Sequence, residues 1–171
     1  MAHRTLKVGV IMDPIDAIAP QKDSSLAMLL EAGRREHEIY YFEQRDLSIR
    51  AGLAEGHARR LVVRDDNDDW FDLGDPARFN LGDLDVILMR KDPPFDMEYV
   101  FATYLLEHAQ RAGTWVINDP RALRDANEKV FTLAFPQCTP PTLISRRKSD
   151  FAGFRREQGE IIVKPLDGMG G

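Results

Sequence analysis

The stretch Leu84–Asp96, LDVILMRKDPPFD, constrains the fold more than any other part of the sequence. Its apolar run Val86–Met89 is short, contains β-branched residues and is bounded by charge and proline, which predicts a buried strand in the centre of a parallel sheet. Arg90, Lys91 and Asp92 follow at its carboxyl end, where Pro93-Pro94 prevents a helix from starting. Open α/β sheets bind ligands beyond the carboxyl ends of their strands, so these charges lie where a ligand would bind. The alternative is an ordinary loop with solvated charges.

Length, charge and cysteine content limit the class of protein. The 171 residues suffice for one sizeable core, or for one domain and part of another. A net charge of −5 with both signs interspersed argues against nucleic acid as a partner. No apolar run approaches the roughly 18 residues of a membrane helix, and the N-terminus lacks the apolar core of a secretory signal. Cys138 is the only cysteine, which predicts a reducing, cytoplasmic compartment.

Alternating strand and helix patterns over the first 125 residues predict an α/β fold with a mostly parallel sheet. The expected elements are strand Leu6–Met12, helix Ser25–Glu36, strand Glu38–Phe42, a hairpin of Leu47–Arg50 with His57–Val63, strand Val86–Met89, helix Met97–Arg111, strand Trp115–Ile117 and a short helix Arg121–Asp125.

Two features exclude common ligands of such folds. No glycine follows the first strand in MDPIDAIAPQKDSS, so a dinucleotide-binding glycine turn is missing. Within the acidic stretch Arg64–Asp75, the run Asp65–Asp69 has neither the central glycine nor the final glutamate of a calcium loop. We therefore expect a solvated loop there, anchored by Trp70 and Phe71. The histidines match no metal-ligand spacing.

The composition changes after Pro136, and the last part of the chain carries a second candidate site. We expect a helix Glu128–Phe135 capped by Asn127, an edge strand Thr139–Ser145, a helix Ser149–Gln158 capped by Ser149, and a strand Ile161–Pro165.

The end of the chain combines lysines with glycines in a pattern that suits phosphate. Lys164 precedes Gly168-Met169-Gly170-Gly171, and glycines let backbone N–H groups approach phosphate oxygens closely. Lys129 stands at the start of the expected helix, where the helix dipole favours anions. The order differs from the Walker pattern, because the lysine comes before the glycines. A flexible turn and a solvated lysine are the alternatives.

Taken together, these stretches resemble bacterial glutathione synthetase, an ATP-grasp ligase. The resemblance rests on five segments that run through the chain in the family's order: VGVIMDPI at Val8–Ile15, KDSSLAMLLEA at Lys22–Ala32, DLDVILMRKDPPFDMEY at Asp83–Tyr99, LRDANEK at Leu123–Lys129, and IIVKPLDGMGG at Ile161–Gly171.

The resemblance implies two folded parts and a reaction. Residues 1–120 are expected to form a Rossmann-like pre-ATP-grasp substrate domain, and residues 121–171 the start of an ATP-grasp domain. The family joins γ-glutamylcysteine to glycine and cleaves ATP to ADP and phosphate through an acyl phosphate. It uses Mg²⁺ or Mn²⁺ and commonly forms homo-oligomers.

The resemblance also assigns residues. Lys129 and Lys164 match the family's nucleotide-contacting lysines. The phosphate loop is matched by Asp167, Gly168, Met169, Gly170 and Gly171. The dipeptide site or its cleft is assigned to Asp13, Arg90 and Asp92.

The family's catalytic groups and metal ligands are expected beyond Gly171, with no metal ligand within this sequence, so we expect the 171-residue piece to be inactive alone. Two other functions remain open at this point. One is another ATP-grasp carboxylate–amine ligase, and the other is a non-catalytic module that binds a nucleotide or a partner.

Overall fold

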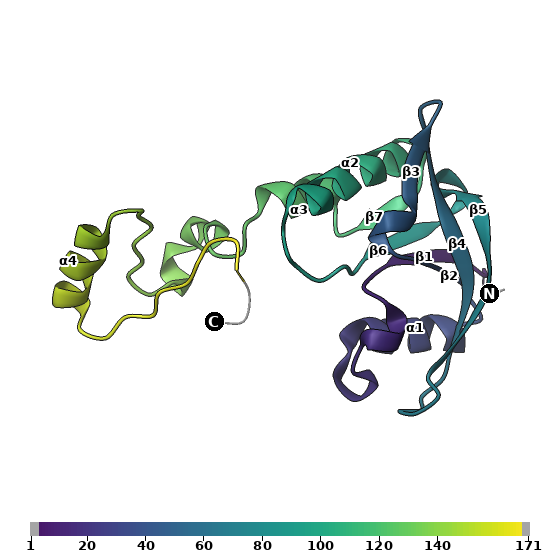
Figure 1. Ribbon diagram of the computed structural model, residues 1–171, viewed down its shortest axis with the longest axis horizontal. Coiled ribbons are helices and arrows are strands. Elements are labelled where there is room, and N and C mark those ends of the chain that lie inside the picture. Colours follow the sequence, from purple (N-terminus) through teal and green to yellow (C-terminus); the bar gives the residue numbers. More distant parts are fainter. Residues whose placement is uncertain (1–3, 169–171) are drawn as a thin grey trace. The chain divides into compact units, whose positions relative to one another are not determined.

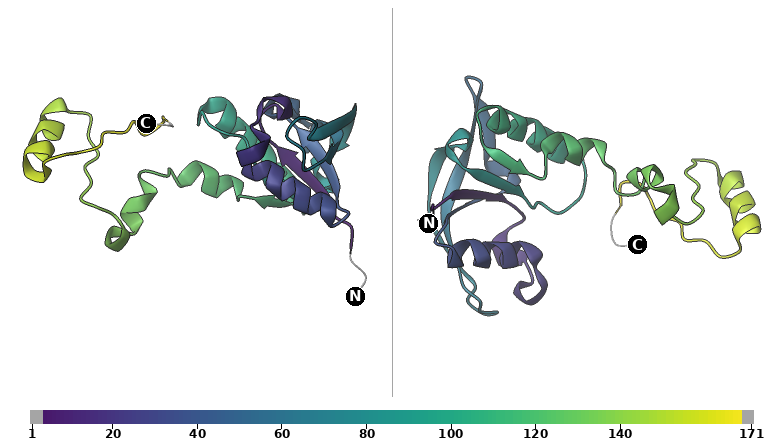
Figure 2. Two further views of the ribbon diagram at one scale, coloured as in Figure 1. Left: turned by 90° about the horizontal axis from the view of Figure 1, so that it is seen from below. Right: turned by 180° about the vertical axis from the view of Figure 1, so that it is seen from behind.

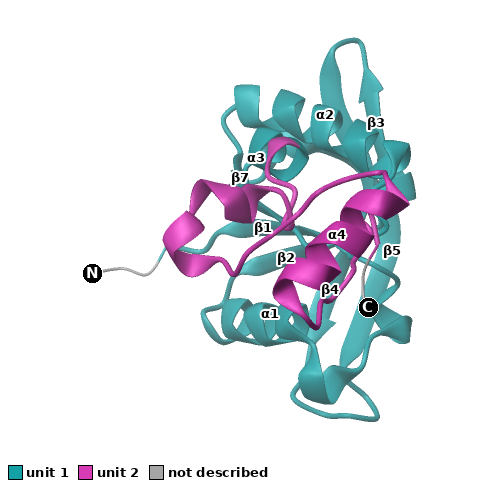
Figure 3. Ribbon diagram, turned by 90° about the vertical axis from the view of Figure 1, so that its left-hand side faces the viewer, with its two compact units in different colours: residues 1–124 teal, residues 125–171 magenta. Residues whose placement is uncertain are grey.

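The computed structural model describes residues 4–168. The chain divides into two compact units, which Figure 3 colours separately: Met1–Arg124 and Asp125–Gly171. They are called the first and the second unit below, and each is described by itself. No helix of the described residues is both long enough and apolar enough to cross a membrane.

The first unit is built on one mixed sheet with the order β3-β4-β2-β1-β6-β7, and β5 pairs with β4. Its strands are β1 (Lys7–Ile11), β2 (Glu38–Phe42), β3 (Leu47–Arg50), β4 (Leu53–Val63), β5 (Phe71–Asn80), β6 (Val86–Met89) and β7 (Trp115–Ile117). β1 pairs in parallel with both β2 and β6, and β6 pairs in parallel with β7. β2, β3 and β5 all pair with β4 in antiparallel fashion. The α/β fold class is confirmed: the parallel strands β2, β1, β6 and β7 form one half of the sheet, and β3, β4 and β5 form the antiparallel half.

Two helices cover opposite faces of this sheet (Figures 1 and 2). The α-helices within residues 4–168 are α1 (Ser24–Arg34), α2 (Met97–Arg111), α3 (Pro120–Asp125) and α4 (Lys148–Gln158). α1 packs Leu29 against Val10 and Ile39, whereas α2 packs Leu106 against Ile87 on the other face. An aspartate caps the start of both α1 and α2. The side chain of Asp23 accepts a hydrogen bond from Leu26 N, and that of Asp96 accepts one from Tyr99 N.

The sequence did not indicate β5. The expected loop Arg64–Asp75 is shorter than predicted, because a strand begins at Phe71 and pairs with β4 up to Asn80. Pro76 lies within this strand and does not break it, since β5 pairs only with β4 and proline is tolerated in edge strands. The anchoring role of Trp70 is confirmed, because its Nε1 donates to the carbonyl of Ile15 at 3.1 Å.

The hairpin of β3 and β4 is also longer than predicted. β4 starts at Leu53, so the connection consists of Ala51 and Gly52 alone. Both residues have positive φ, of 50° and 83°, as a tight two-residue hairpin turn requires.

The second unit contains less regular structure than the sequence predicts. The expected strands Thr139–Ser145 and Ile161–Pro165 are irregular, and the expected helix Glu128–Phe135 is a turn followed by a 3₁₀ segment at Phe131–Ala134. α4 is present, but Ser149 does not cap it, because the residue before the helix is Arg147. The physical reason is visible in the burial: no described residue from 125 to 168 is buried, and Ile162 is 85% exposed. A strand needs a hydrogen-bonded neighbour and a covered face, and the described part of this unit supplies neither.

We expect Gly56→Ala to destabilise the first unit. A Cβ at this position would lie 2.8 Å from Phe42 Cε1 and 3.3 Å from the carbonyl oxygen of Asp46. The ring of Phe42 is fully buried and rigid, so the substitution should cost about 1–3 kcal/mol. Thermal unfolding followed by circular dichroism measures this loss. Gly33→Ala in α1 is the matched control, because a Cβ there meets only Val63 Cγ2 at 4.0 Å. Equal midpoints for the two variants would contradict the expectation.

Candidate functional site

Charged side chains meet where the parallel strands β1 and β6 end. The chain leaves β1 to one side of the sheet and reaches β6 on the other, so a ligand-binding crevice is expected between these two strands. The Asp13 carboxylate, just after β1, accepts a hydrogen bond from Asp92 N at 2.9 Å. It also forms an ion pair with Lys91 Nζ at 2.9 Å. The two strand ends are thereby tied together, and the structure brings Asp13 and Asp92 to one place.

Arg90 joins the same group from the end of β6. Its Nε donates to Ser25 Oγ at 3.0 Å and its Nη2 to Ser24 Oγ at 2.9 Å, both in the first turn of α1. Its backbone N–H donates to the Ile11 carbonyl at 2.7 Å, which fixes the start of the side chain. A guanidinium has five N–H donors, and these contacts use two of them. Arg90 therefore keeps donors that can bind a carboxylate. We call Asp13, Ser24, Ser25, Arg90, Lys91 and Asp92 the strand-end cluster.

The pKa of Tyr99 in α2 is affected by the charges of this cluster. Burial raises the pKa of Tyr99 above its usual value, and the positive charge of Arg90 acts in the opposite direction. The negative charge of Asp92 adds to the effect of burial. Tyr99 is therefore a neutral phenol at physiological pH, and the charge of the cluster comes from its acidic and basic side chains.

The second unit contains an open hollow of about 1020 Å³. Lys129 and Lys164 both line it, although they lie 35 positions apart in the sequence. The walls between them are largely apolar, with Leu143, Phe154 and Ile161 among the lining residues. Apolar walls with a few charged groups are typical of small-molecule sites. We call this the lysine hollow.

Lys129 holds the loop that follows Lys164. Its Nζ donates to the carbonyl of Gly168 at 2.8 Å and to that of Leu166 at 3.3 Å, and it pairs with Glu128 at 2.6 Å. The Lys129 ammonium lowers the pKa of the Glu128 carboxyl group. Asn127 Nδ2 also donates to Leu166 O at 3.0 Å. Lys164 is exposed, and its ammonium forms no hydrogen bond or ion pair with a described residue.

The predictions for the phosphate-site residues have different outcomes. Lys129 does not lie at a helix N-terminus, so the helix-dipole argument for it is wrong; its turn is instead capped by Asn127 Oδ1, which accepts from Lys129 N at 3.0 Å. Asp167 lies in the described loop. Gly168 packs tightly, because a Cβ would lie 2.5 Å from Pro165 Cγ. Met169, Gly170 and Gly171 lie outside the described residues.

The predicted site residues did not include four residues that the structure places in these sites. Lys91, Ser24 and Ser25 contact the predicted residues of the strand-end cluster, and Asn127 holds the loop beside Lys129. Lys91 was recognised at the strand end between Arg90 and Asp92, but it was given no role in the site. Ser24 and Ser25 could not be assigned from the sequence, because their contact with Arg90 depends on how α1 packs beside the end of β6. Within residues 4–168, no three His, Cys, Asp or Glu side chains are grouped as metal ligands.

Comparison with solved structures identifies the class of fold. The structure of the ATP-grasp ligase PsnB, complexed with a minimal precursor, matches 96% of this chain and 55% of its own, with a TM-score of 0.53 and 19% sequence identity. At this identity the likeness concerns the fold alone.

Sequence comparison then identifies the family. Residues 6–124 match the N-terminal domain of prokaryotic glutathione synthetase, and residues 128–171 match its ATP-grasp domain. The chain belongs to the prokaryotic glutathione synthetase family. The glutathione synthetase of Yersinia pestis is 55% identical over 97% of this chain and 52% of its own length. That of Pseudomonas aeruginosa is 54% identical over 98% of this chain and 53% of its own length. The chain thus spans about half the length of these curated relatives.

Proposed function

We propose that this chain is the nucleotide-binding and dipeptide-binding half of a glutathione synthetase, which joins γ-glutamylcysteine to glycine at the expense of ATP. The observation that carries the proposal is the lysine hollow, where Lys129 and Lys164 line one cavity beside a glycine-containing loop. Membership of the family and relatives named glutathione synthetase support it.

The lysine hollow suits a nucleotide. The two ammonium groups neutralise phosphate charge, and the apolar walls cover a base that would otherwise face water. The carbonyls that now accept from Lys129 belong to the loop Leu166–Gly168, so phosphate oxygens would compete for the same ammonium. In this proposal Asp167, Gly168, Met169, Gly170 and Gly171 form the phosphate loop.

The strand-end cluster suits a substrate that carries both signs of charge. Arg90 binds a carboxylate of γ-glutamylcysteine, whereas Asp13 and Asp92 hold the strand ends in place and favour its ammonium group. Glycine is the second substrate. Mg²⁺ or Mn²⁺, when bound with ATP, neutralises further phosphate charge, and its protein ligands are expected outside this chain.

The remaining assignments follow from the same proposal. Residues 1–120 act as the substrate domain and residues 121–171 as the opening of the ATP-grasp domain. The enzyme works in the cytoplasm as a homo-oligomer, with neither nucleic acid nor membrane as a partner. The 171-residue chain by itself is inactive.

Phosphate release by the complete gene product tests the proposal. The protein is supplied with ATP, Mg²⁺, γ-glutamylcysteine and glycine, and each substrate is then omitted in turn. Release that needs both amino-acid substrates is expected. Release with an amine other than glycine would instead indicate a different carboxylate–amine ligase, and no release from folded, full-length protein would indicate a binding module.

A further inference from the structure

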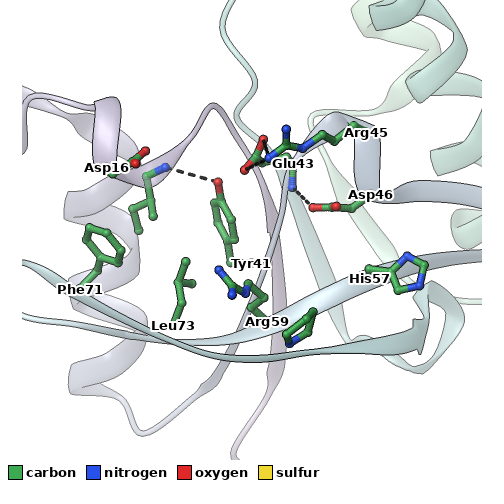
Figure 4. Close-up of a pocket in the computed structure, with 11 residues that line it drawn as sticks. Asp16, Tyr41, Glu43, Arg45, Asp46, His57, Arg59, Phe71 and Leu73 are labelled. Carbon is green, nitrogen blue, oxygen red and sulfur yellow. Dashed lines mark hydrogen bonds and ion pairs between the residues drawn. The ribbon is translucent and has the colours of Figure 1, made fainter.

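A cavity of about 400 Å³ lies in the first unit, at the end of β2 (Figure 4). It lies outside the strand-end cluster, and the proposed ligase reaction does not use it. Its lining comes from the turn after β1, from β2 and the turn that follows it, and from β4 and β5. Its volume is in the range of small-molecule sites. We call it the β2 cavity.

One wall of the β2 cavity is apolar. Ile15 and Tyr41 are buried, and Phe71, Leu73 and Pro76 of β5 complete the wall. The Tyr41 hydroxyl accepts from Ile15 N at 3.3 Å and donates to the Asp13 carbonyl at 3.5 Å. Burial raises the pKa of Tyr41, so the phenol stays neutral and adds no charge to the wall. This wall can cover the apolar part of a ligand.

Three charged residues of the lining form hydrogen bonds and an ion pair with one another. Arg45 pairs with Glu43 at 3.0 Å. The Asp46 carboxylate accepts from Glu43 N at 2.8 Å, and the Glu43 side chain accepts from the backbone of Asp46 in return. This group holds the turn after β2 and offers little to a ligand.

Three further ionisable residues line the cavity without such partners. Within residues 4–168, the side chains of Asp16, His57 and Arg59 have no hydrogen bond or ion pair. Arg59 stands opposite Tyr41 on the neighbouring strand, and its guanidinium reaches toward the Tyr41 ring (Figure 4). Asp16 lies across the cavity, in the turn after β1. The cavity therefore holds one free anion and one free cation beside an apolar wall.

We propose that the β2 cavity binds a zwitterionic α-amino acid with an apolar side chain. Arg59 binds the carboxylate, and Asp16 binds the ammonium group. The side chain of the ligand packs against Phe71 and Leu73. A phosphate or another polyanion is disfavoured, because the lining carries three carboxylates, on Asp16, Glu43 and Asp46, against the guanidinium groups of Arg45 and Arg59. No residue that lines the β2 cavity belongs to the strand-end cluster or lines the lysine hollow.

A titration with three matched ligands tests the proposal on the 171-residue chain. The probes are leucine, 4-methylpentanoate, which lacks the ammonium group, and 3-methylbutylamine, which lacks the carboxylate. Backbone amide shifts are followed by NMR. Leucine should give saturable shifts around the β2 cavity, and each analogue should bind about tenfold more weakly, because each loses one charged hydrogen-bonding group.

Single substitutions separate this site from a general charge effect. Arg59→Gln and Asp16→Asn should each weaken leucine binding by about tenfold. Arg60→Gln is the matched control, because it removes the same charge from the next residue of β4. The Arg60 guanidinium lies 5.4 Å from the centre of the Tyr40 ring, on the opposite face of the sheet. Its affinity for leucine should stay within about twofold.

Four outcomes would overturn the proposal. Equal binding of leucine and 4-methylpentanoate would mean a simple anion site. Saturable shifts centred elsewhere would place the ligand at another surface. No saturable shift at about 20 mM leucine, well above the Kd of about 1 mM of a weak specific site, would exclude binding. An equal loss of affinity in Arg59→Gln and Arg60→Gln would mean a long-range charge effect. The amide spectrum of each variant shows whether it is folded.

Discussion

Lys164→Ala in the complete gene product should lower kcat/KM for ATP by about 100-fold, the usual loss when one preorganised charged donor is removed from a phosphoryl-transfer site. Lys164 lines the lysine hollow and is exposed, so its ammonium is available to phosphate oxygens. The substitution breaks no hydrogen bond or ion pair within the described residues. The midpoint of thermal unfolding should therefore stay the same, and the loss should appear only in steady-state kinetics with varied ATP.

Lys148→Ala is the matched control for this prediction. Lys148 is an exposed lysine at the start of α4, in the same unit, and it does not line the lysine hollow. Its kcat/KM for ATP should stay within about twofold of the parent protein. Turnover of Lys164→Ala that matches Lys148→Ala would remove Lys164 from the phosphate site and would weaken the nucleotide assignment of the whole hollow.

Periodicity and capping predicted the first unit well, because that unit contains its own core. β2, α2 and β7 have the predicted boundaries, and their apolar residues pack against one another inside the unit. β5 was missed because its sequence, FDLGDPARFN, contains a proline and a glycine that normally interrupt strands. Pairing with β4 outweighs that local signal, and such pairing cannot be recognised in one segment considered alone.

The second unit was predicted less well, for a related reason. Ile161–Pro165 has the composition of a strand, but in the described residues it has no neighbour to pair with, and Val163 is 63% exposed. A strand-like composition leads to a strand only where a neighbouring strand and a packed face are available. The pairing of Lys129 with Lys164 in one hollow is a tertiary property too. The lysines and glycines suggested a common phosphate site and the resemblance to the family agreed with it, but spacing in the sequence did not decide it.

Arg90→Lys should raise KM for γ-glutamylcysteine by about 30-fold or more in the complete gene product, while KM for ATP changes by less than about twofold. Lysine keeps the positive charge, but it lacks the planar fork with which Arg90 contacts Ser24 and Ser25 and still presents free donors. A single ammonium cannot serve the helix and a substrate carboxylate in the same geometry. Initial-rate measurements with each substrate varied in turn separate the two KM values.

The paired variant Ser24→Ala/Ser25→Ala tests whether Arg90 acts on the substrate or only positions α1. It removes both hydroxyl acceptors and leaves the guanidinium in place, while Asp23 still caps the helix by accepting from Leu26 N at 2.7 Å. If Arg90 binds the dipeptide directly, this variant should raise KM for γ-glutamylcysteine by less than about fivefold, because the charge and the fork remain. A rise equal to that of Arg90→Lys would instead make Arg90 a positioning residue whose effect passes through α1. An unchanged KM in Arg90→Lys would exclude both roles and would place the dipeptide away from the end of β6.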